Sequence, residues 1–247
     1  MDLGLQGKRA VVAASSAGLG FGTAEALLGE GATVVINGRD PDRLAEAASR
    51  LPGAIPIAGD VGTSDGAAVF VTEAMERLGG IDVLVTNAGG PPPGDYGSTP
   101  LDAYPTALEL SLLSVVAMCT TAVPAMRAQA WGRIVAITSV SVRQPIPNLI
   151  LSNTARAGVT GFLKTLAREI AGDGVTVNSI QPGTHNTDRI RSVFGTDLTA
   201  LGEGIPAGRV GDAASFGKIA TFLCSDAAWF VTGASLPVDG GSYAGLQ

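Results

Sequence analysis

A strand, a tight loop and the start of a helix lie in one stretch of the chain, Ala13-Ala14-Ser15-Ser16-Ala17-Gly18-Leu19-Gly20. The apolar run at 9–13 predicts a strand, and the segment from 18 to 29 predicts a helix. Glycines let the backbone approach a ligand closely, and the first turn of a helix offers unpaired N–H groups to a phosphate. The stretch therefore predicts a site for the phosphate of a dinucleotide, at Ser15, Ser16, Gly18, Leu19 and Gly20.

Outward from this loop, short apolar runs alternate with helical segments along the whole chain. Further strands are predicted at 33–37, 54–58, 81–86, 133–138, 175–180 and near 235–238, with helices between them. Continuously apolar strands separated by helices indicate a parallel sheet that is covered on both faces. We expect a single α/β domain over residues 1–247, built as a doubly wound parallel sheet of the Rossmann fold.

The composition limits the classes of function. Hydrophobic residues make up 46% of the 247 residues and charged residues 15%, which suffices for one sizeable core. The net charge is −6 and the isoelectric point about 4.7, so nucleic acid and anionic membranes are not expected as partners. No uninterrupted apolar run approaches the roughly 18 residues of a membrane span, and no signal peptide precedes the first strand, so we expect a cytoplasmic protein. One histidine and two distant cysteines exclude a structural zinc site, and no metal is expected.

The end of the second predicted strand, Asn37-Gly38-Arg39-Asp40, indicates which dinucleotide binds. An acidic side chain at this point of a dinucleotide-binding fold hydrogen-bonds the ribose 2′-hydroxyl of NAD. Gly38 leaves that place without a side chain, whereas Arg39 can pair with the 2′-phosphate of NADP. We therefore predict NADP as the cofactor, with NAD as the alternative if Arg39 is only a solvated residue at a helix start.

Four further segments follow the order of the motifs of a known family. They are Asp60-Val61, Asn87-Ala88-Gly89, Pro182-Gly183 with Thr187, and Val238-Asp239-Gly240-Gly241. Together with the glycine loop they resemble the short-chain dehydrogenase/reductase family, and the layout is most similar to the 3-oxoacyl-acyl-carrier-protein reductases. The resemblance implies further cofactor contacts at Asp60, Val61, Asn87, Ala88, Gly89, Pro182, Gly183, His185 and Thr187.

The departures from the family pattern fall on the reacting groups. The family's catalytic tetrad is Asn, Ser, Tyr and Lys. Ser139 stands at the family's Ser position, but Ser152 stands where the Tyr belongs and Arg156 where the Lys belongs. Ser111 takes the Asn position in a long central helix. The chain thus resembles a divergent subgroup of these reductases that lacks the Tyr-x-x-x-Lys pair, and its candidate catalytic residues are Ser139, Ser152, Arg156 and Ser111.

A serine hydroxyl is a much weaker acid than a tyrosine, whose ordinary pKa is about 10, so Ser152 is a poor proton donor. A water molecule held between Ser139, Ser152 and Arg156 is the better candidate. Arg156 keeps its charge and can donate to two ribose hydroxyls or to a developing alkoxide, so it is also a cofactor contact. Two residues are weaker candidates: His185 as an acid or base, and Arg143 as a contact for an acidic substrate.

These observations favour an NADP-dependent oxidoreductase that reduces a small-molecule carbonyl or oxidises an alcohol, and a 3-oxoacyl thioester fits the resemblance. The alternative is an NADP-binding sensor or partner subunit without hydride transfer, because three tetrad residues are replaced. A third hypothesis is a scaffold that binds no nucleotide, because Ala14 replaces the glycine of the tight turn. An alanine with positive φ stores about 1–3 kcal/mol of strain there, whereas one with negative φ stores little.

Residues 182–211 predict an irregular loop, and the part from 185 to 210 is similar to the family's substrate lid. It contains Asp188, Arg189 and Arg191, together with glycines that suit hinge motion. Family members of this architecture commonly assemble as tetramers through two long central helices, predicted in this chain at 99–129 and 149–171. The resemblance therefore implies a homo-oligomer, a tetramer.

Overall fold

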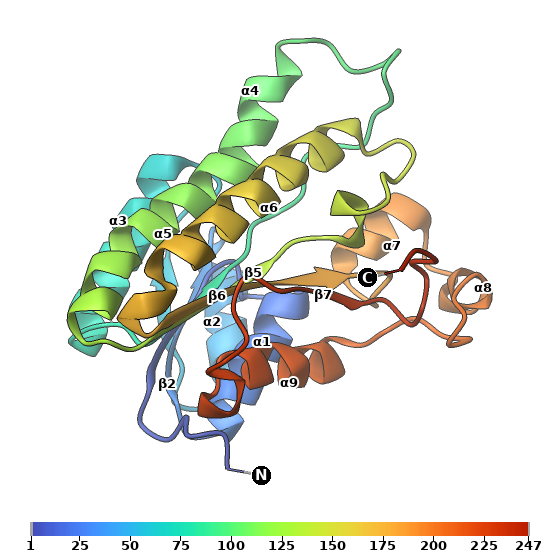
Figure 1. Cartoon of the computed structure of the whole chain (residues 1–247). Coiled ribbons are helices and arrows are strands. Elements are labelled where there is room, and N and C mark those ends of the chain that lie inside the picture. The colour runs from blue at the N-terminus through green and yellow to red at the C-terminus, as the bar shows by residue number, and fades with distance from the viewer. Residues whose placement is uncertain (1, 247) are drawn as a thin grey trace.

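Seven parallel strands form one sheet in the computed structural model of the chain, which describes residues 2–246 (Figure 1). They are β1 (Arg9–Val12), β2 (Thr33–Gly38), β3 (Ile55–Ala58), β4 (Val83–Thr86), β5 (Gly132–Ile137), β6 (Val175–Pro182) and β7 (Ser235–Val238). The strand order β3-β2-β1-β4-β5-β6-β7 confirms the predicted doubly wound parallel sheet. The order reverses between β1 and β4, and ligands of such sheets bind outside the carboxyl ends of the strands at this point.

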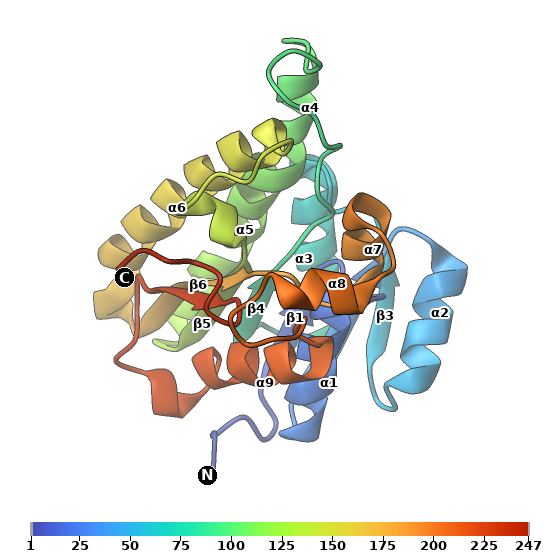
Figure 2. The same ribbon diagram turned by 90° about the vertical axis from the view of Figure 1, so that its right-hand side faces the viewer.

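Helices cover both faces of the sheet (Figures 1 and 2). One face carries α3 (Ser64–Leu78), α5 (Ser114–Ala128) and α6 (Ile150–Ile170), and the other carries α1 (Gly18–Gly29), α2 (Pro41–Arg50) and α9 (Ala213–Leu223). Side chains alternate along each strand, so Val11 joins the apolar cluster on the first face and Val12 the cluster on the second. Because both faces are buried, the inner strands are mainly apolar, although β6 also buries the polar side chains of Thr176, Asn178 and Gln181.

The long central helix differs from the prediction at its start and in its middle. Leu101 and Asp102 form a turn, and the helix begins at Ala103 rather than directly after residue 99. It runs as α4 (Ala103–Leu108), a π-helical turn η1 (Glu109–Leu113) and then α5. A π-helical turn accommodates one extra residue, and such turns are frequent at functional sites.

The segment after β6 is more regular than the predicted loop. It contains two short helices, α7 (Asp188–Phe194) and α8 (Leu198–Glu203). The side chain of Thr187 caps α7, and that of Asp197 caps α8 by accepting from two backbone N–H groups at 3.0 and 3.1 Å. The prediction of a loop was wrong here because frequent glycines break the helical pattern, while local side-chain caps stabilise short helices that a periodicity of apolar residues does not show.

Within the described part of the chain, Ala103–Ala128 is the one helical stretch that is long and apolar enough to cross a membrane by length and composition. An 18-residue window in it has a mean hydropathy of 1.7. Polar residues, among them serines and threonines, interrupt this stretch, so it forms no uninterrupted apolar run in the sequence. In the fold, α5 packs against α3, α6 and the sheet.

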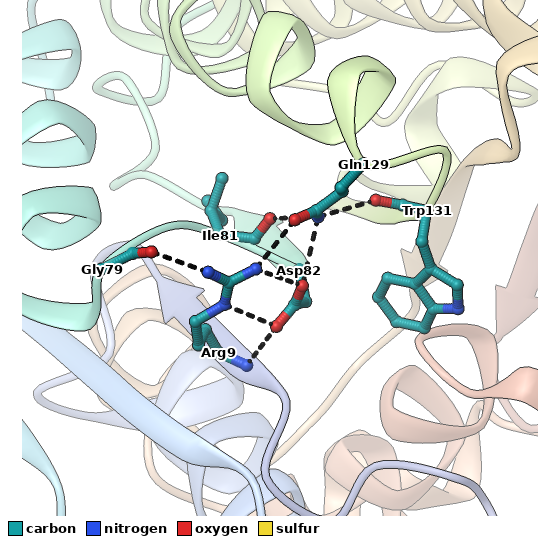
Figure 3. A network of polar contacts seen from close by, with 6 residues as sticks. All are labelled: Arg9, Gly79, Ile81, Asp82, Gln129 and Trp131. Atoms are coloured by element: carbon teal, nitrogen blue, oxygen red, sulfur yellow. Dashed lines mark hydrogen bonds and ion pairs between the residues drawn. The ribbon is translucent and has the colours of Figure 1, made fainter.

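A polar network ties the amino ends of β1 and β4 to the end of α5 (Figure 3). Arg9 donates to the two carboxylate oxygens of Asp82 at 2.7 and 2.8 Å and to the carbonyl oxygen of Gly79 at 2.8 Å. Gln129 accepts from Arg9 at 2.8 Å and donates to Asp82 at 3.1 Å. Burial raises the pKa of Asp82, but the hydrogen bonds and charge of Arg9 outweigh burial and hold that pKa below its ordinary value.

Replacing Asp82 by Asn is expected to lower the free energy of unfolding by about 2–4 kcal/mol, because the substitution leaves the charge of Arg9 without its partner. Since the pKa of Asp82 is lowered in the fold, the carboxylate stabilises the protein fully above about pH 4. That stabilisation is lost as the pH falls through the lowered pKa. Urea unfolding of both proteins from about pH 7 down to about pH 3 should therefore show a difference that shrinks in acid.

The control for this comparison is Glu73→Gln, which removes an ion pair between two exposed side chains, Glu73 and Arg77. We expect it to change the free energy of unfolding by less than about 0.5 kcal/mol. An Asp82→Asn protein as stable as this control would contradict a structural role for the network.

Candidate active site

Helix α1 begins without a side-chain cap, directly after the loop that follows β1. Its N-cap residue is Ala17, whose methyl group accepts no hydrogen bond. Side-chain oxygens cap five other helices, α2, α3, α7, α8 and α9. The first N–H groups of α1, at Gly18, Leu19 and Gly20, are thus left for a ligand. Together with the positive end of the helix dipole, they suit a phosphate.

One side chain, Asn37 at the end of β2, holds the loop before α1 in place. Its amide oxygen accepts from the N–H of Ala14 at 3.1 Å, and its amide nitrogen donates to the carbonyl oxygens of Ile57 and Gly59, both at 3.1 Å. Its backbone carbonyl oxygen accepts from the N–H of Ser15 at 2.8 Å. Because Asn37 is fully buried, one residue connects the loop, β2 and β3 away from water.

The two loop serines differ in what they offer to a ligand. The hydroxyl of Ser15 is fully buried, donates to the carbonyl oxygen of Val12 at 2.7 Å and accepts from the N–H of Asn37 at 2.9 Å. The structure thus gives Ser15 a role inside the loop, where a cofactor contact was expected. Ser16 is half-buried beside Gly38, and a Cβ built at Gly38 would lie 2.9 Å from the Ser16 hydroxyl oxygen.

Ala14 adopts a φ of +44°. Its backbone is therefore strained, as expected for an alanine with positive φ. Its conformation is held from both sides, by Asn37 at its N–H and by the side-chain nitrogen of Asn87, which donates to its carbonyl oxygen at 3.1 Å. Gly20 packs directly on this turn. A Cβ built at Gly20 would lie 2.6 Å from the carbonyl oxygen of Ala14, so only glycine allows α1 to start here.

Replacing Ala14 by Gly is expected to raise the free energy of unfolding by about 1 kcal/mol, because glycine adopts positive φ without strain. In a chain of this size that corresponds to a rise in melting temperature of roughly 2–4 °C. Thermal unfolding followed by circular dichroism measures it. Ala130→Gly, at the exposed Ala130 with φ of +52°, is the matched control for relief of strain elsewhere. An Ala14→Gly protein that is less stable than the wild type would contradict the inference that Ala14 is strained.

Arg39 and Asp60 stand at the carboxyl ends of β2 and β3. The Nε of Arg39 lies 3.9 Å from a carboxylate oxygen of Asp60, and the two side chains are 74% and 54% exposed. An ion pair this exposed contributes little free energy, so it does not hold Arg39 against a stronger anion. Val61 is buried directly after Asp60. The arrangement leaves Arg39 available to a phosphate beside Ser16 and Gly38.

The remaining predicted cofactor residues lie at the ends of β4 and β6. Asn87 follows β4 and donates to the carbonyl oxygen of Ala14 in the loop before α1. Gly183 follows β6 and donates its N–H to the carbonyl oxygen of Val238 at 2.9 Å. A Cβ built at Gly18 would lie 3.4 Å from the methyl carbon of Thr187, so the segment after β6 faces the start of α1. Ala88, Gly89 and Pro182 belong to these same two strand ends.

The four candidate catalytic residues gather around the amino end of α6. Ser152 is buried and lies one turn before Arg156 on this helix. Ser139 precedes the short helix η2 (Val140–Val142) and Ser111 lies in η1, and both η1 and η2 pack against α6. The hydroxyl oxygen of Ser139 accepts from the N–H of Ser141 at 3.1 Å. Its hydroxyl proton can therefore be donated to another acceptor.

Arg156 has no acidic partner in the part of the chain that the structure describes. Its Nη1 donates to the carbonyl oxygen of Ile137 at 3.1 Å. Burial, and to a lesser degree the positive charge of Arg189, lower the pKa of Arg156 to about 10. The group is still a cation at neutral pH, so it brings positive charge and unused donors to the end of β5.

Three buried hydroxyl groups lie on neighbouring elements, η1, the end of β4 and η2. They belong to Ser111, Thr86 and Ser141, and none has a hydrogen-bond partner among residues 2–246. A buried polar group without a partner costs about 1–3 kcal/mol, and such groups are normally satisfied by ordered water or a ligand. Ser111 sits in the π-helical turn, which moves this hydroxyl out of the regular helical pattern.

His185 was expected to contact the cofactor or to act as an acid or base, but the structure packs it inside the protein. It is 4% exposed, and its ring meets the edge of Phe216 with 5.2 Å between ring centroids. A β-bridge joins His185 to Gly211, so the two ends of the 185–210 segment meet. Burial lowers the pKa of His185, and the neutral ring anchors the base of this segment.

Arg143 is likewise committed to protein groups. Its Nε donates to the side-chain oxygen of Gln181 at 2.7 Å, and its Nη2 donates to the carbonyl oxygen of Ser235 at 2.6 Å. These bonds tie the turn after β5 to β6 and β7. They give Arg143 a structural role, where a contact for an acidic substrate was one hypothesis.

Arg189 on α7 was named among the charged residues of the 185–210 segment, but no contact was predicted for it. Its Nη2 donates to the carbonyl oxygen of Pro91 at 2.6 Å, and a Cβ built at Gly90 would lie 3.0 Å from the same nitrogen. On the other side, Asp188 pairs with Arg43 of α2 at 3.1 Å. Segments almost a hundred positions apart meet here, and no local pattern indicates such a contact.

A cavity of about 310 Å³ lies next to the cluster around α6. Its walls are the proline run Pro91–Pro93, residues of α4, Leu110 and Leu151. Leu110 and Leu151 are the immediate sequence neighbours of Ser111 and Ser152. The walls are mainly apolar, and the volume suits a small organic molecule.

The chain matches one family over nearly its whole length. The family model described as enoyl-(acyl carrier protein) reductase matches residues 13–243. The chain belongs to the short-chain dehydrogenase/reductase family. One member, 2,3-dihydroxy-2,3-dihydro-p-cumate dehydrogenase of Pseudomonas putida, is 33% identical over 97% of this chain and 96% of its own. Another, 3-oxoacyl-[acyl-carrier-protein] reductase of Haemophilus influenzae, is 32% identical over 97% of this chain and 99% of its own.

The family is also found among solved structures. L-sorbose reductase from Gluconobacter frateurii, in complex with NADPH and L-sorbose, superposes with a TM-score of 0.92. It is 32% identical in sequence, and the match covers 100% of both chains. The family resemblance inferred from the motifs is thus confirmed.

Proposed function

We propose that this short-chain dehydrogenase/reductase is an NADP-dependent oxidoreductase that transfers hydride between the cofactor and a small-molecule carbonyl or alcohol. The observation that carries the proposal is the uncapped start of α1, which faces Thr187 at the switch point of the sheet. The relatives support it, since each is named as a reductase or dehydrogenase and one structure contains NADPH.

In this proposal, the cofactor phosphates lie on the N–H groups of Gly18, Leu19 and Gly20. These N–H groups are accessible because the turn before α1 is small and because Gly20 has no side chain. Arg39 and the hydroxyl of Ser16 take the 2′-phosphate. An acidic residue in place of Gly38 would clash with Ser16, which disfavours the NAD arrangement. The remaining contacts come from Asp60, Val61, Asn87, Ala88, Gly89, Pro182, Gly183 and Thr187.

The bound cofactor supplies or accepts the hydride, and the protein holds the carbonyl oxygen and its proton. Ser139 donates its hydroxyl to that oxygen, and Arg156 stabilises the negative charge that develops on it. Because Ser152 stands where the family has its Tyr, the proton comes from a water molecule held by Ser139, Ser152 and Arg156. The hydroxide that remains is stabilised by the charge of Arg156 until it takes a proton from solvent. The buried hydroxyl of Ser111 holds a second water. Losing a general acid costs about 10²–10⁴-fold in rate, out of about 10⁶-fold or more, so turnover persists.

Residues 185–210 act as the substrate lid in this proposal. Both of its ends are anchored, by the bridge between His185 and Gly211 and by the N–H of Ala207, which donates to the carbonyl oxygen of Gly240 at 3.0 Å. Its first helix, α7, reaches the segment after β4 through Arg189. A 3-oxoacyl thioester is one carbonyl substrate compatible with this arrangement, as the relative from Haemophilus influenzae suggests.

The test is oxidation of NADPH, followed by its absorbance, with a panel of ketones, oxo acids and 3-oxoacyl thioesters. We expect slow turnover of at least one class, and a loss of about 10²–10³-fold in kcat/KM for Arg156→Ala, because the charge that stabilises the alkoxide is removed. Calorimetry with NADPH confirms in parallel that each variant still binds the cofactor.

The double variant Ser152→Tyr, Arg156→Lys separates the proposal from its alternative. If the wild-type protein binds NADPH but reduces nothing while the double variant reduces ketones, the protein is a nucleotide-binding sensor or partner subunit. If wild-type turnover exceeds that of Arg156→Ala, the oxidoreductase proposal holds.

Arg39→Asp is expected to lower the ratio of NADPH affinity to NADH affinity by about 10-fold or more, because it replaces an attractive charge at the 2′-phosphate with a repulsive one. Isothermal calorimetry with both cofactors measures the ratio. Lys218→Asp, which makes the same charge change at an exposed position of α9, is the control. An unchanged ratio in Arg39→Asp would refute the assignment.

We also propose that the protein assembles as a homo-oligomer, a tetramer by analogy with its family. The apolar stretch Ala103–Ala128 supports this, because only 39% of its most apolar window is buried within one chain. A second copy packed on this stretch would cover the rest.

A further inference from the structure

One wall of the cavity of about 310 Å³ is tied to the start of α6 by backbone hydrogen bonds. The N–H of Gly94 donates to the carbonyl oxygen of Asn148 at 2.8 Å, and the N–H of Ile150 donates to the carbonyl oxygen of Gly94 at 3.2 Å. A β-bridge between Gly94 and Leu149 completes this short ladder. The proline wall ends directly before Gly94, and α6 begins at Ile150, so the wall lies beside the helix start that carries Ser152.

The opposite wall leads to the same place. It consists of residues of α4, which packs against α6 (Figures 1 and 2). This wall ends at Leu110 in η1, and Leu110 is followed by Ser111, whose buried hydroxyl has no hydrogen-bond partner among residues 2–246. Leu151, which also lines the cavity, is followed by the buried Ser152. On both elements a leucine of the cavity wall directly precedes a candidate catalytic serine, so the cavity adjoins the candidate site.

The side chains that line the cavity are all uncharged in the described part of the chain. They are prolines, alanines and leucines, together with three hydroxyl groups, at Ser98, Thr99 and Thr106. The hydroxyl of Ser98 is already engaged, since it donates to a carboxylate oxygen of Asp95 at 2.7 Å and accepts from the N–H of Asp95 at 3.1 Å. Proline has no backbone N–H, so the run 91–93 adds no donor. The walls thus offer a ligand apolar contact and few hydrogen bonds.

This chemistry discriminates between neutral and charged ligands. A carboxylate that moves from water into the cavity loses hydration and finds no positive side chain in the walls to replace it. The hydroxyl groups of a sugar lose hydrogen bonds to water, for which the walls offer few replacements. An alkyl group, by contrast, gains about four-fold in affinity for each CH₂ group that is buried. The cavity is therefore suited to the apolar part of a neutral molecule.

We propose that the substrate is a neutral ketone, or the matching secondary alcohol, whose apolar body fills the cavity between α4 and Pro91–Pro93. The reacting carbonyl rests on the proposed function, whereas the apolar site stands on its own. Among the carbonyl compounds considered above, the proposal disfavours oxo acids. It makes the side chains of the walls, including Thr106 of α4, determinants of substrate specificity.

Binding tests the apolar site without any turnover. Calorimetry in the presence of saturating NADP⁺ compares 2-octanone with 7-oxooctanoate, in which a carboxylate replaces the terminal methyl group. We expect the wild-type protein to bind 2-octanone at least about 10-fold more tightly. From 2-butanone to 2-octanone, the affinity should rise by about two- to four-fold per CH₂ group. Equal affinities for 2-octanone and the acid, or no rise along the series, would overturn the proposal.

Thr106→Lys tests where the ligand binds. Thr106 is exposed on α4 and lines the cavity, so the fold tolerates a lysine there, and its charge supplies what the walls lack. It should strengthen binding of 7-oxooctanoate by about 10-fold and leave NADPH unchanged. Thr72→Lys makes the same change at an exposed position of α3, outside the cavity, and should alter neither affinity. If Thr106→Lys affects the acid no more than Thr72→Lys does, the ligand binds elsewhere and the proposal is wrong.

Turnover separates this inference from the proposed function. If NADPH is oxidised with 2-octanone in preference to 7-oxooctanoate, and Thr106→Lys narrows the preference through KM, both proposals are supported. Oxidation with both compounds at equal kcat/KM contradicts the apolar site and leaves the oxidoreductase standing. Selective binding of 2-octanone without NADPH oxidation contradicts the oxidoreductase and leaves the apolar site standing.

Discussion

The buried carboxamide of Asn37 is the constraint on which the cofactor end of the molecule depends. Its side chain and backbone connect the turn at Ala14, the end of β2 and the segment after β3. The turn at Ala14 also contacts Gly20, at the start of α1, and accepts a hydrogen bond from Asn87, after the end of β4. Because these hydrogen bonds lie away from water, they are strong enough to hold Ala14 in a backbone conformation that alanine otherwise avoids. The strain at Ala14 is thus held by one side chain from a neighbouring strand.

Much of the fold can be predicted from the sequence, because apolar strands, glycines and helix periods are local signals. The sheet and the meeting of the β1, β4 and β6 ends follow from them. The roles of Ser15 and His185 cannot be predicted in this way, because whether a polar side chain turns inward depends on what packs over it. Arg189 was named in the 185–210 segment, but its contact with the segment after β4 was not predicted, because its partner Pro91 is distant in sequence. The π-helical turn leaves no pattern in residue types at all.

The predicted exchange of the family's Tyr and Lys for Ser152 and Arg156 changes the electrostatics of the site as well as its acid. A tyrosine–lysine pair combines a proton source with one positive charge. Ser152 offers a neutral hydroxyl, and Arg156 offers a charge that cannot be given up near neutral pH. In the proposed mechanism, stabilising negative charge is therefore the main contribution of the protein, and water transfers the proton.

The π-helical turn η1 divides the long central helix into two parts with separate duties. After it, α5 packs against α3 and the sheet, and before it, α4 lines the cavity. One residue added to or removed from a helix rotates what lies beyond it by about 100°. A single-codon deletion within η1 would thus turn the cavity wall while α5 keeps its register in the core. Evolution can reshape the pocket of such an enzyme by insertion and deletion at one helical turn, without exchanging any core side chain.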